Sequence, residues 1–150
     1  MTIFVGADHR GYYFKEQIMA ILKKQGYTAV DVGSYDPDAR CDYPEIAYKV
    51  ATKVASSSHH KGILLCMSGI GQTIAANKVR GAYAALCHNA TSAAFSRRHN
   101  NANILVLGAD FVNKKDLPRI LRTWLNTKFE GGRHQRRIKQ IKKIEKGLKV

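Results

Sequence analysis

Short apolar runs alternate with longer segments of helical periodicity along the whole chain. Apolar runs bounded by turn residues are typical of buried strands. Five such runs lie at residues 3–5, 28–32, 62–66, 83–87 and 103–108. Segments in which apolar residues recur every three or four positions predict helices that bury one face. These lie at about residues 11–25, 43–56, 71–78, 89–99, 114–126 and 135–146.

The alternation of strands and helices predicts an α/β fold. Strands that are apolar throughout belong to parallel sheets whose two faces are covered by helices. We therefore expect a Rossmann-like, three-layer α/β/α sandwich with a five-stranded parallel sheet. No linker, low-complexity tract or internal repeat divides the 150 residues, so residues 1–150 are expected to form one domain.

Composition narrows the class of protein. With 45% hydrophobic residues, the chain can bury a core without disulfides or a structural metal. Its three cysteines, at positions 41, 66 and 87, form no CxxC pair, which favours a reducing compartment. The first residues lack a signal-peptide pattern, and no run of about eighteen apolar residues exists. We expect a cytoplasmic protein with no membrane partner.

The formal net charge of +14 raises the question of a nucleic-acid partner. Residues 131–150 hold eight lysines and arginines against one acid, and Ile138, Ile141 and Ile144 recur there at helical spacing. This predicts a basic amphipathic helix at about 135–146. No zinc-finger spacing or RNA-binding aromatic pattern accompanies it, so we expect no nucleic-acid partner and a solvated face that attracts anionic metabolites.

The segment after the third expected strand carries the candidate chemistry. Ligands of parallel α/β sheets bind beyond the carboxyl ends of the strands, and residues 66–71 there read Cys-Met-Ser-Gly-Ile-Gly. Free N–H groups at a helix start attract an anion, and the same field is expected to lower the pKa of the Cys66 thiol. The alternative is a buried strand cysteine followed by an ordinary tight turn, because a lone Gly-x-Gly is weak evidence.

The same turn matches neither common nucleotide-binding pattern. It lacks the Gly-Lys-Ser/Thr of a phosphate-binding loop and the third glycine of the dinucleotide fingerprint. We therefore expect neither ATP nor NAD, and no cofactor. A base beside fixed N–H donors is what an isomerase needs to move a proton between adjacent carbons and to hold the developing enediolate oxygen.

At these residues the chain resembles the type B ribose-5-phosphate isomerases and the related galactose-6-phosphate isomerase subunits. The matching segments follow one order over nearly the whole length, and together they are specific. They are residues 6–9, 42–44, 62–66, 68–71, 74–78, 96–100, 103–105, 130–134 and 137. The resemblance implies one sugar-phosphate isomerase domain, residues 1–150, that works through a cis-enediolate without a metal.

The resemblance also implies roles for individual residues. Cys66 matches the catalytic base, Ser68 the hydroxyl that moves protons between the two oxygens, and His99 the residue that assists opening of the furanose ring. The implied substrate-binding residues are Asp8, His9, Tyr43, Gly69, Ile70, Gly71, Asn100, Arg133 and Arg137. The two arginines would bind the phosphate through paired charge-assisted bonds.

In the family that the chain resembles, two subunits share each active site. The resemblance thus implies a homodimer, alone or paired into a tetramer, in which His99 and the arginines of one chain face Cys66 of the other. Met67 stands where the family commonly has glycine, and its bulk leaves the preferred sugar open.

Each candidate residue also has a structural reading. Asp8 can cap the next helix, His99 can pair with a helix dipole, and Arg133 can be a solvated loop charge. Their joint occurrence favours function. His59 and His60 lack acidic or cysteine ligands at suitable spacing, so we expect no metal site.

The leading hypothesis is an enzyme of the non-oxidative pentose phosphate pathway that interconverts ribose 5-phosphate and ribulose 5-phosphate. Within the same class, the alternative is an allose- or galactose-6-phosphate isomerase. Two hypotheses from other classes stay open, a basic nucleic-acid-binding module and a non-catalytic sugar-phosphate sensor.

Overall fold

Five strands form one sheet in the order β2-β1-β3-β5-β4, and every neighbouring pair is parallel. The computed structural model describes residues 1–150. The strands are β1 Ile3–Ala7, β2 Ala29–Asp31, β3 Lys61–Cys66, β4 Ala84–Leu86 and β5 Ile104–Gly108. The expected five-stranded parallel α/β sandwich is therefore confirmed.

Six α-helices connect and follow the strands. They are α1 Tyr12–Lys24, α2 Tyr43–Ala55, α3 Ile70–Ala76, α4 Ala90–Arg98, α5 Leu117–Asn126 and α6 Gly132–Glu145, with short 3-10 helices η1 His9–Gly11 and η2 Lys114–Asp116. The last helix begins at Gly132 rather than near 135, and Gly131 precedes it with a φ of 72°. The paired glycines hid this start, because glycine ordinarily breaks a helical pattern.

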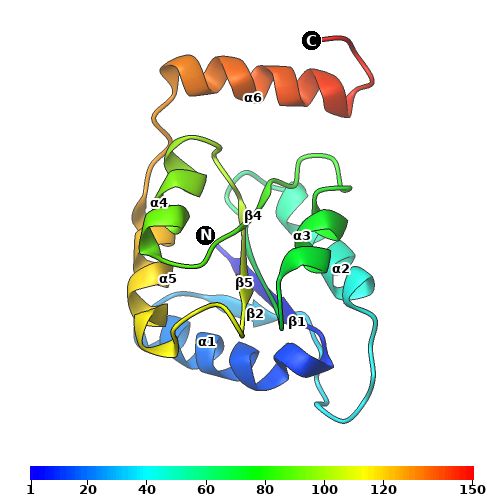
Figure 1. The fold of residues 1–150 in the computed structure, drawn as a ribbon, viewed down its shortest axis with the longest axis vertical. Coiled ribbons are helices and arrows are strands. Elements are labelled where there is room, and N and C mark those ends of the chain that lie inside the picture. The colour runs from blue at the N-terminus through cyan, green and yellow to red at the C-terminus, as the bar shows by residue number, and fades with distance from the viewer.

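Two hydrophobic cores lie on opposite faces of the sheet. On one face, Phe14 and Ile18 of α1 pack with Ile120 and Trp124 of α5 against the alternate residues of the central strands. On the other face, α2 packs against the sheet mainly through Ile46, Val50 and Val54, with α3 beside it. Figure 1 shows these two layers with the sheet between them. None of the helices combines the length and the hydropathy that a membrane-spanning segment needs.

Helix α6 stands apart from the layers. Figure 1 shows it (orange to red) lying across the end of the sheet at which the strands begin. The Glu145 carboxylate ties it to the body by accepting hydrogen bonds from the Gly81 N–H and the Tyr83 hydroxyl, both at 3.1 Å. Between α6 and the body lies a cavity of about 690 Å³ that is lined by Ile141, Ile144 and the segment 82–85.

Candidate active site

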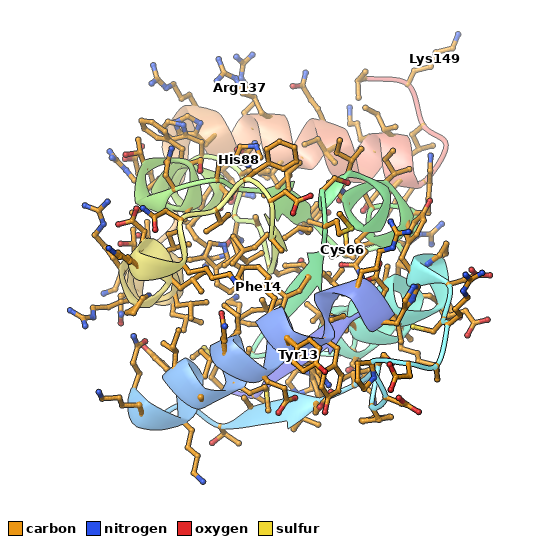
Figure 2. The ribbon with its side chains drawn as sticks, turned by 60° about the horizontal axis from the view of Figure 1, so that its bottom comes forward. Tyr13, Phe14, Cys66, His88, Arg137 and Lys149 are labelled. Atoms are coloured by element: carbon orange, nitrogen blue, oxygen red, sulfur yellow. The ribbon has the colours of Figure 1, made fainter.

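The thiol of Cys66 lies where β3 ends and is only 7% exposed. The next residues turn back on it, so that the Gly69 N–H donates to Sγ at 2.9 Å. The Ile70 N–H faces the Ser68 hydroxyl oxygen at 3.3 Å. A thiol, a hydroxyl and the amide groups at the start of α3 therefore lie together in one turn. Figure 2 shows Cys66 within the body of the molecule.

Glycine is required at two positions of this turn. Gly69 has a φ of 79°, and a Cβ there would lie 2.5 Å from Cδ1 of Leu86. A Cβ on Gly71 would lie 2.6 Å from the Tyr43 ring. The turn therefore owes its shape to backbone conformation and close packing, and Tyr43 of α2 is brought against the start of α3.

The expected lowering of the Cys66 pKa is wrong. Burial raises the pKa of the thiol, and the negative charge of Asp8 raises it further. Hydrogen bonds from the turn oppose this and lower the pKa, but they do not outweigh the burial. Desolvation disfavours a thiolate more than one short helix start favours it.

Asp8, His9 and Tyr43 lie at the same edge of the sheet as Cys66. Asp8 follows β1 and is 8% exposed. Its side chain caps η1 by accepting a hydrogen bond from the Gly11 N–H at 2.8 Å, which confirms the alternative prediction that Asp8 is a helix cap. The ring nitrogen Nδ1 of His9 accepts a hydrogen bond from the Cys41 N–H at 3.4 Å. All three residues line a hollow of about 360 Å³. This hollow lies beside the carboxyl end of β1, which is the neighbour of β3 in the sheet.

A separate group of predicted site residues lies at the other end of the sheet and consists of His99, Asn100, Arg133 and Arg137. His99 caps α4, which runs back from the carboxyl end of β4 toward the start of β5. The Asn103 carbonyl just beyond accepts from the N–H of Gly62 at the beginning of β3. Gly62 and Cys66 are roughly 13 Å apart along the strand. Figure 2 shows Arg137 on α6 directed away from the body that holds Cys66.

This second group contains an acid and a histidine to which the sequence assigned no role. Oε2 of Glu130 lies 3.8 Å from Nε2 of His99 and 3.6 Å from Nε2 of His134. The rings of His99 and His134 stack with centroids 4.2 Å apart. The spacing of the motif at residues 130–134 could have indicated part of this cluster, because Glu130 and His134 are four residues apart and can contact each other. The contact with His99, which is 31 residues away in the sequence, could be found only from the fold.

The side chains of His99, Glu130 and His134 are close enough to be considered as metal ligands, since their ligand atoms lie within 4.8 Å of one another. Two nitrogens on one zinc ion lie roughly 3.3 Å apart, with lone pairs that converge on the metal. The two rings here are parallel to within 8°, and the Arg133 Nε–H donates to Nε2 of His134 at 3.4 Å. The arrangement suits ring stacking and hydrogen bonding better than chelation.

The protein has an α/β fold with a thiol-bearing turn at the end of β3 and a distant group of basic residues. This combination suits an isomerase that acts on an anionic substrate. The sequence matches the family described as Ribose/Galactose Isomerase over residues 3–141, and the chain belongs to this family. It is a sugar-phosphate isomerase of that family.

Two solved structures and one curated relative illustrate the similarity. Ribose-5-phosphate isomerase B of Clostridium thermocellum is 45% identical, with a TM-score of 0.94 over 98% of this chain and 99% of that one. The Mycoplasma genitalium isomerase B with bound ribulose-5-phosphate is 44% identical, with a TM-score of 0.92 over 97% and 96%. D-erythrulose-4-phosphate isomerase of Pectobacterium atrosepticum is 39% identical, over 94% of this chain and 93% of its own.

Proposed function

We propose that this chain interconverts ribose 5-phosphate and ribulose 5-phosphate through a cis-enediolate. The observation that carries the proposal is the turn at Cys66, which holds a thiol beside the amide groups at the start of α3. Proton transfer between adjacent carbons needs a base and fixed donors for the enediolate oxygen, and this turn offers both. Solved relatives named ribose-5-phosphate isomerase B, one with bound ribulose-5-phosphate, support the choice of sugar.

In the proposed reaction, Cys66 as thiolate removes the C2 proton of the aldose. The electron pair moves into the C1–C2 bond, and the N–H groups of residues 69–71 stabilise the oxyanion. Cys66 then returns the proton to C1, while Ser68 moves a proton between O1 and O2. Asp8, His9 and Tyr43, which line the adjacent hollow, would hold the sugar hydroxyls.

A second copy of the chain would complete the site. His99, Asn100, Arg133 and Arg137 cannot reach Cys66 of their own chain, because they lie at the opposite end of the sheet. Around the thiol-bearing turn, the apolar side chains of Met67, Ile70 and Ile74 are 41–57% exposed. Exposed apolar surface of this kind marks an interface. We therefore propose a homodimer in which each site draws residues from both chains.

The proposal is tested by measuring turnover of ribose 5-phosphate by the purified chain, with and without EDTA. Turnover that EDTA leaves unchanged is the expected result. If D-erythrulose 4-phosphate or a six-carbon sugar phosphate is turned over instead, the chain acts on that substrate. Binding of ribose 5-phosphate without turnover would select a sensor, and salt-sensitive binding of nucleic acid alone would select the basic binding module.

The pKa of the thiol predicts how turnover depends on pH. A raised pKa keeps Cys66 protonated to higher pH, and only the thiolate can act as the base. We therefore expect kcat/KM for ribose 5-phosphate to rise with pH through neutrality and to level off only above the pKa of an ordinary thiol. A pH–rate profile checks this, and a profile that is already flat at neutral pH would contradict it.

Removing one proposed phosphate ligand should weaken substrate binding more than it slows the chemistry. A charge-assisted hydrogen bond contributes about 1.5–3 kcal/mol, so Arg137→Ala should raise KM about 10- to 100-fold with little change in kcat. Arg136→Ala is the matched control, because Arg136 is the adjacent exposed arginine on the same helix. Equal effects of the two substitutions on KM would indicate that general positive charge, not a specific ligand, attracts the phosphate.

A further inference from the structure

The two oxygens of the Glu130 carboxylate face different partners. Oε1 accepts a hydrogen bond from Nε of Arg98 at 2.7 Å, and Nη2 of the same guanidinium also pairs with it. The Glu130 N–H donates to the Arg98 carbonyl at 3.0 Å, which ties the backbone of this segment to the last turn of α4. The Arg98 hydrogen bond lowers the pKa of the Glu130 carboxyl, so the group is an anion at neutral pH. Oε2 is left to face the two histidines.

Of those two histidines, His134 is the buried one, at 5% exposed. Burial lowers the pKa of its ring, and the nearby charges of His99, Arg133 and Arg137 lower it further, against the opposite pull of Glu130. His134 is therefore neutral at neutral pH. Its Nε2 accepts a hydrogen bond from Nε of Arg133.

Two other rings pack against the ring of His99. The His134 ring stacks on one face with planes 8° apart, and the Phe95 ring packs with planes 29° apart and centroids separated by 5.0 Å. Its Nε2 faces Oε2 of Glu130 at 3.8 Å, and the side chain is 32% exposed. With its plane set by the stacked rings and its Nε2 edge turned toward the carboxylate, the imidazole directs its other nitrogen, Nδ1, away from Glu130.

We infer that Glu130 is a positioning residue for His99: its negative carboxylate attracts the Nε2 edge of the ring, the stacked ring of His134 fixes the plane, and Nδ1 is left to meet the cyclic sugar. The inference rests on the proposed function. Ring opening moves the O1 proton to Nδ1, forms the C1 carbonyl and breaks the C1–O4 bond, whose electron pair stays on O4. O4 then takes the proton back from Nδ1, so no other reactant is needed.

The first test is a double-mutant cycle on turnover of ribose 5-phosphate. Glu130→Gln should lower turnover up to about 100-fold, the cost of misplacing a reacting group by about 1 Å. Because Glu130 acts through His99, adding Glu130→Gln to His99→Asn should cause no further loss. Asp116→Asn is the control, since it removes another exposed carboxylate paired with an arginine, Arg119 at 3.3 Å, and should leave turnover unchanged. An equal loss in both backgrounds would overturn the inference.

The second test separates ring opening from proton transfer. Ribulose 5-phosphate is acyclic, because the hydroxyl that would close a five-membered ring carries the phosphate. Its exchange of C1 hydrogen with D₂O therefore needs Cys66 but no ring opening. In the Glu130→Gln chain this exchange should stay within a few-fold of wild type while turnover of ribose 5-phosphate falls. Parallel loss of both would mean that Glu130 supports the whole site and would overturn the inference.

A crystal structure of the Glu130→Gln chain tests the inference without an activity assay. If the wild type does not turn over ribose 5-phosphate, the proposed function has failed, but this structure still decides whether Glu130 positions His99. The inference expects the His99 ring to leave its parallel stack on His134. A ring that keeps its stacked position without the carboxylate would show that Glu130 does not position it.

Discussion

The Cys66→Ala chain should lose turnover of ribose 5-phosphate by at least about 10³-fold and keep its affinity for the sugar phosphate. General base catalysis contributes about 10² to 10⁴-fold, and nothing else in the turn can accept a carbon-bound proton, because Ser68 offers only a neutral hydroxyl. The arginines proposed to bind phosphate belong to α6, which the substitution leaves unchanged. Steady-state kinetics and calorimetric titration of ribose 5-phosphate measure the two effects.

Cys87→Ala is the matched control. Cys87 also follows a strand of the sheet, is 1% exposed, and has a thiol pKa raised by burial. Its substitution should leave a small cavity and near wild-type turnover. Retained turnover in the Cys66→Ala chain would refute the assignment of the base, and equal loss in both chains would show that turnover depends on packing of the sheet.

Sequence patterns predicted the strands and helices of this fold, because each buries a continuous or periodic apolar face. The order of the strands could not be read in the same way. β4 lies at the edge and β5 inside, although both are short apolar runs at similar spacing. In the structure, residues Ile104 to Leu107 of the longer β5 are 0% exposed. This burial identifies β5 as the strand that is covered on both faces.

The candidate site was predicted unevenly. The Cys66 turn could be predicted because its chemistry lies within six consecutive residues. The thiol pKa could not, since it depends on burial and on Asp8, which is 58 positions away in the sequence. Glu130 and His134 were visible only as parts of a motif, because their contacts with His99 arise where α4 and α6 meet.

Mixing two inactive variants should restore activity if two chains share each site. The Cys66→Ala and His99→Asn substitutions fall in the two separate groups of residues, one at each end of the sheet. In a heterodimer of these chains, one site would contain both defects and the other would contain neither. Random reassociation of an equal mixture makes half of the dimers mixed, so about one quarter of wild-type turnover should return.

The restored activity would be specific to this pairing. Mixing Cys66→Ala with Ser68→Ala should restore nothing, because both residues belong to the same turn and each site would keep one defect. The mixture is made by denaturing and refolding the chains together, and turnover of ribose 5-phosphate is then measured against each variant refolded alone. Absence of recovery in a mixture shown by mass spectrometry to contain mixed dimers would mean that one chain supplies a whole site. His99 and the arginines would then have to act outside the site, because α4 and α6 hold them at the opposite end of the sheet from Cys66.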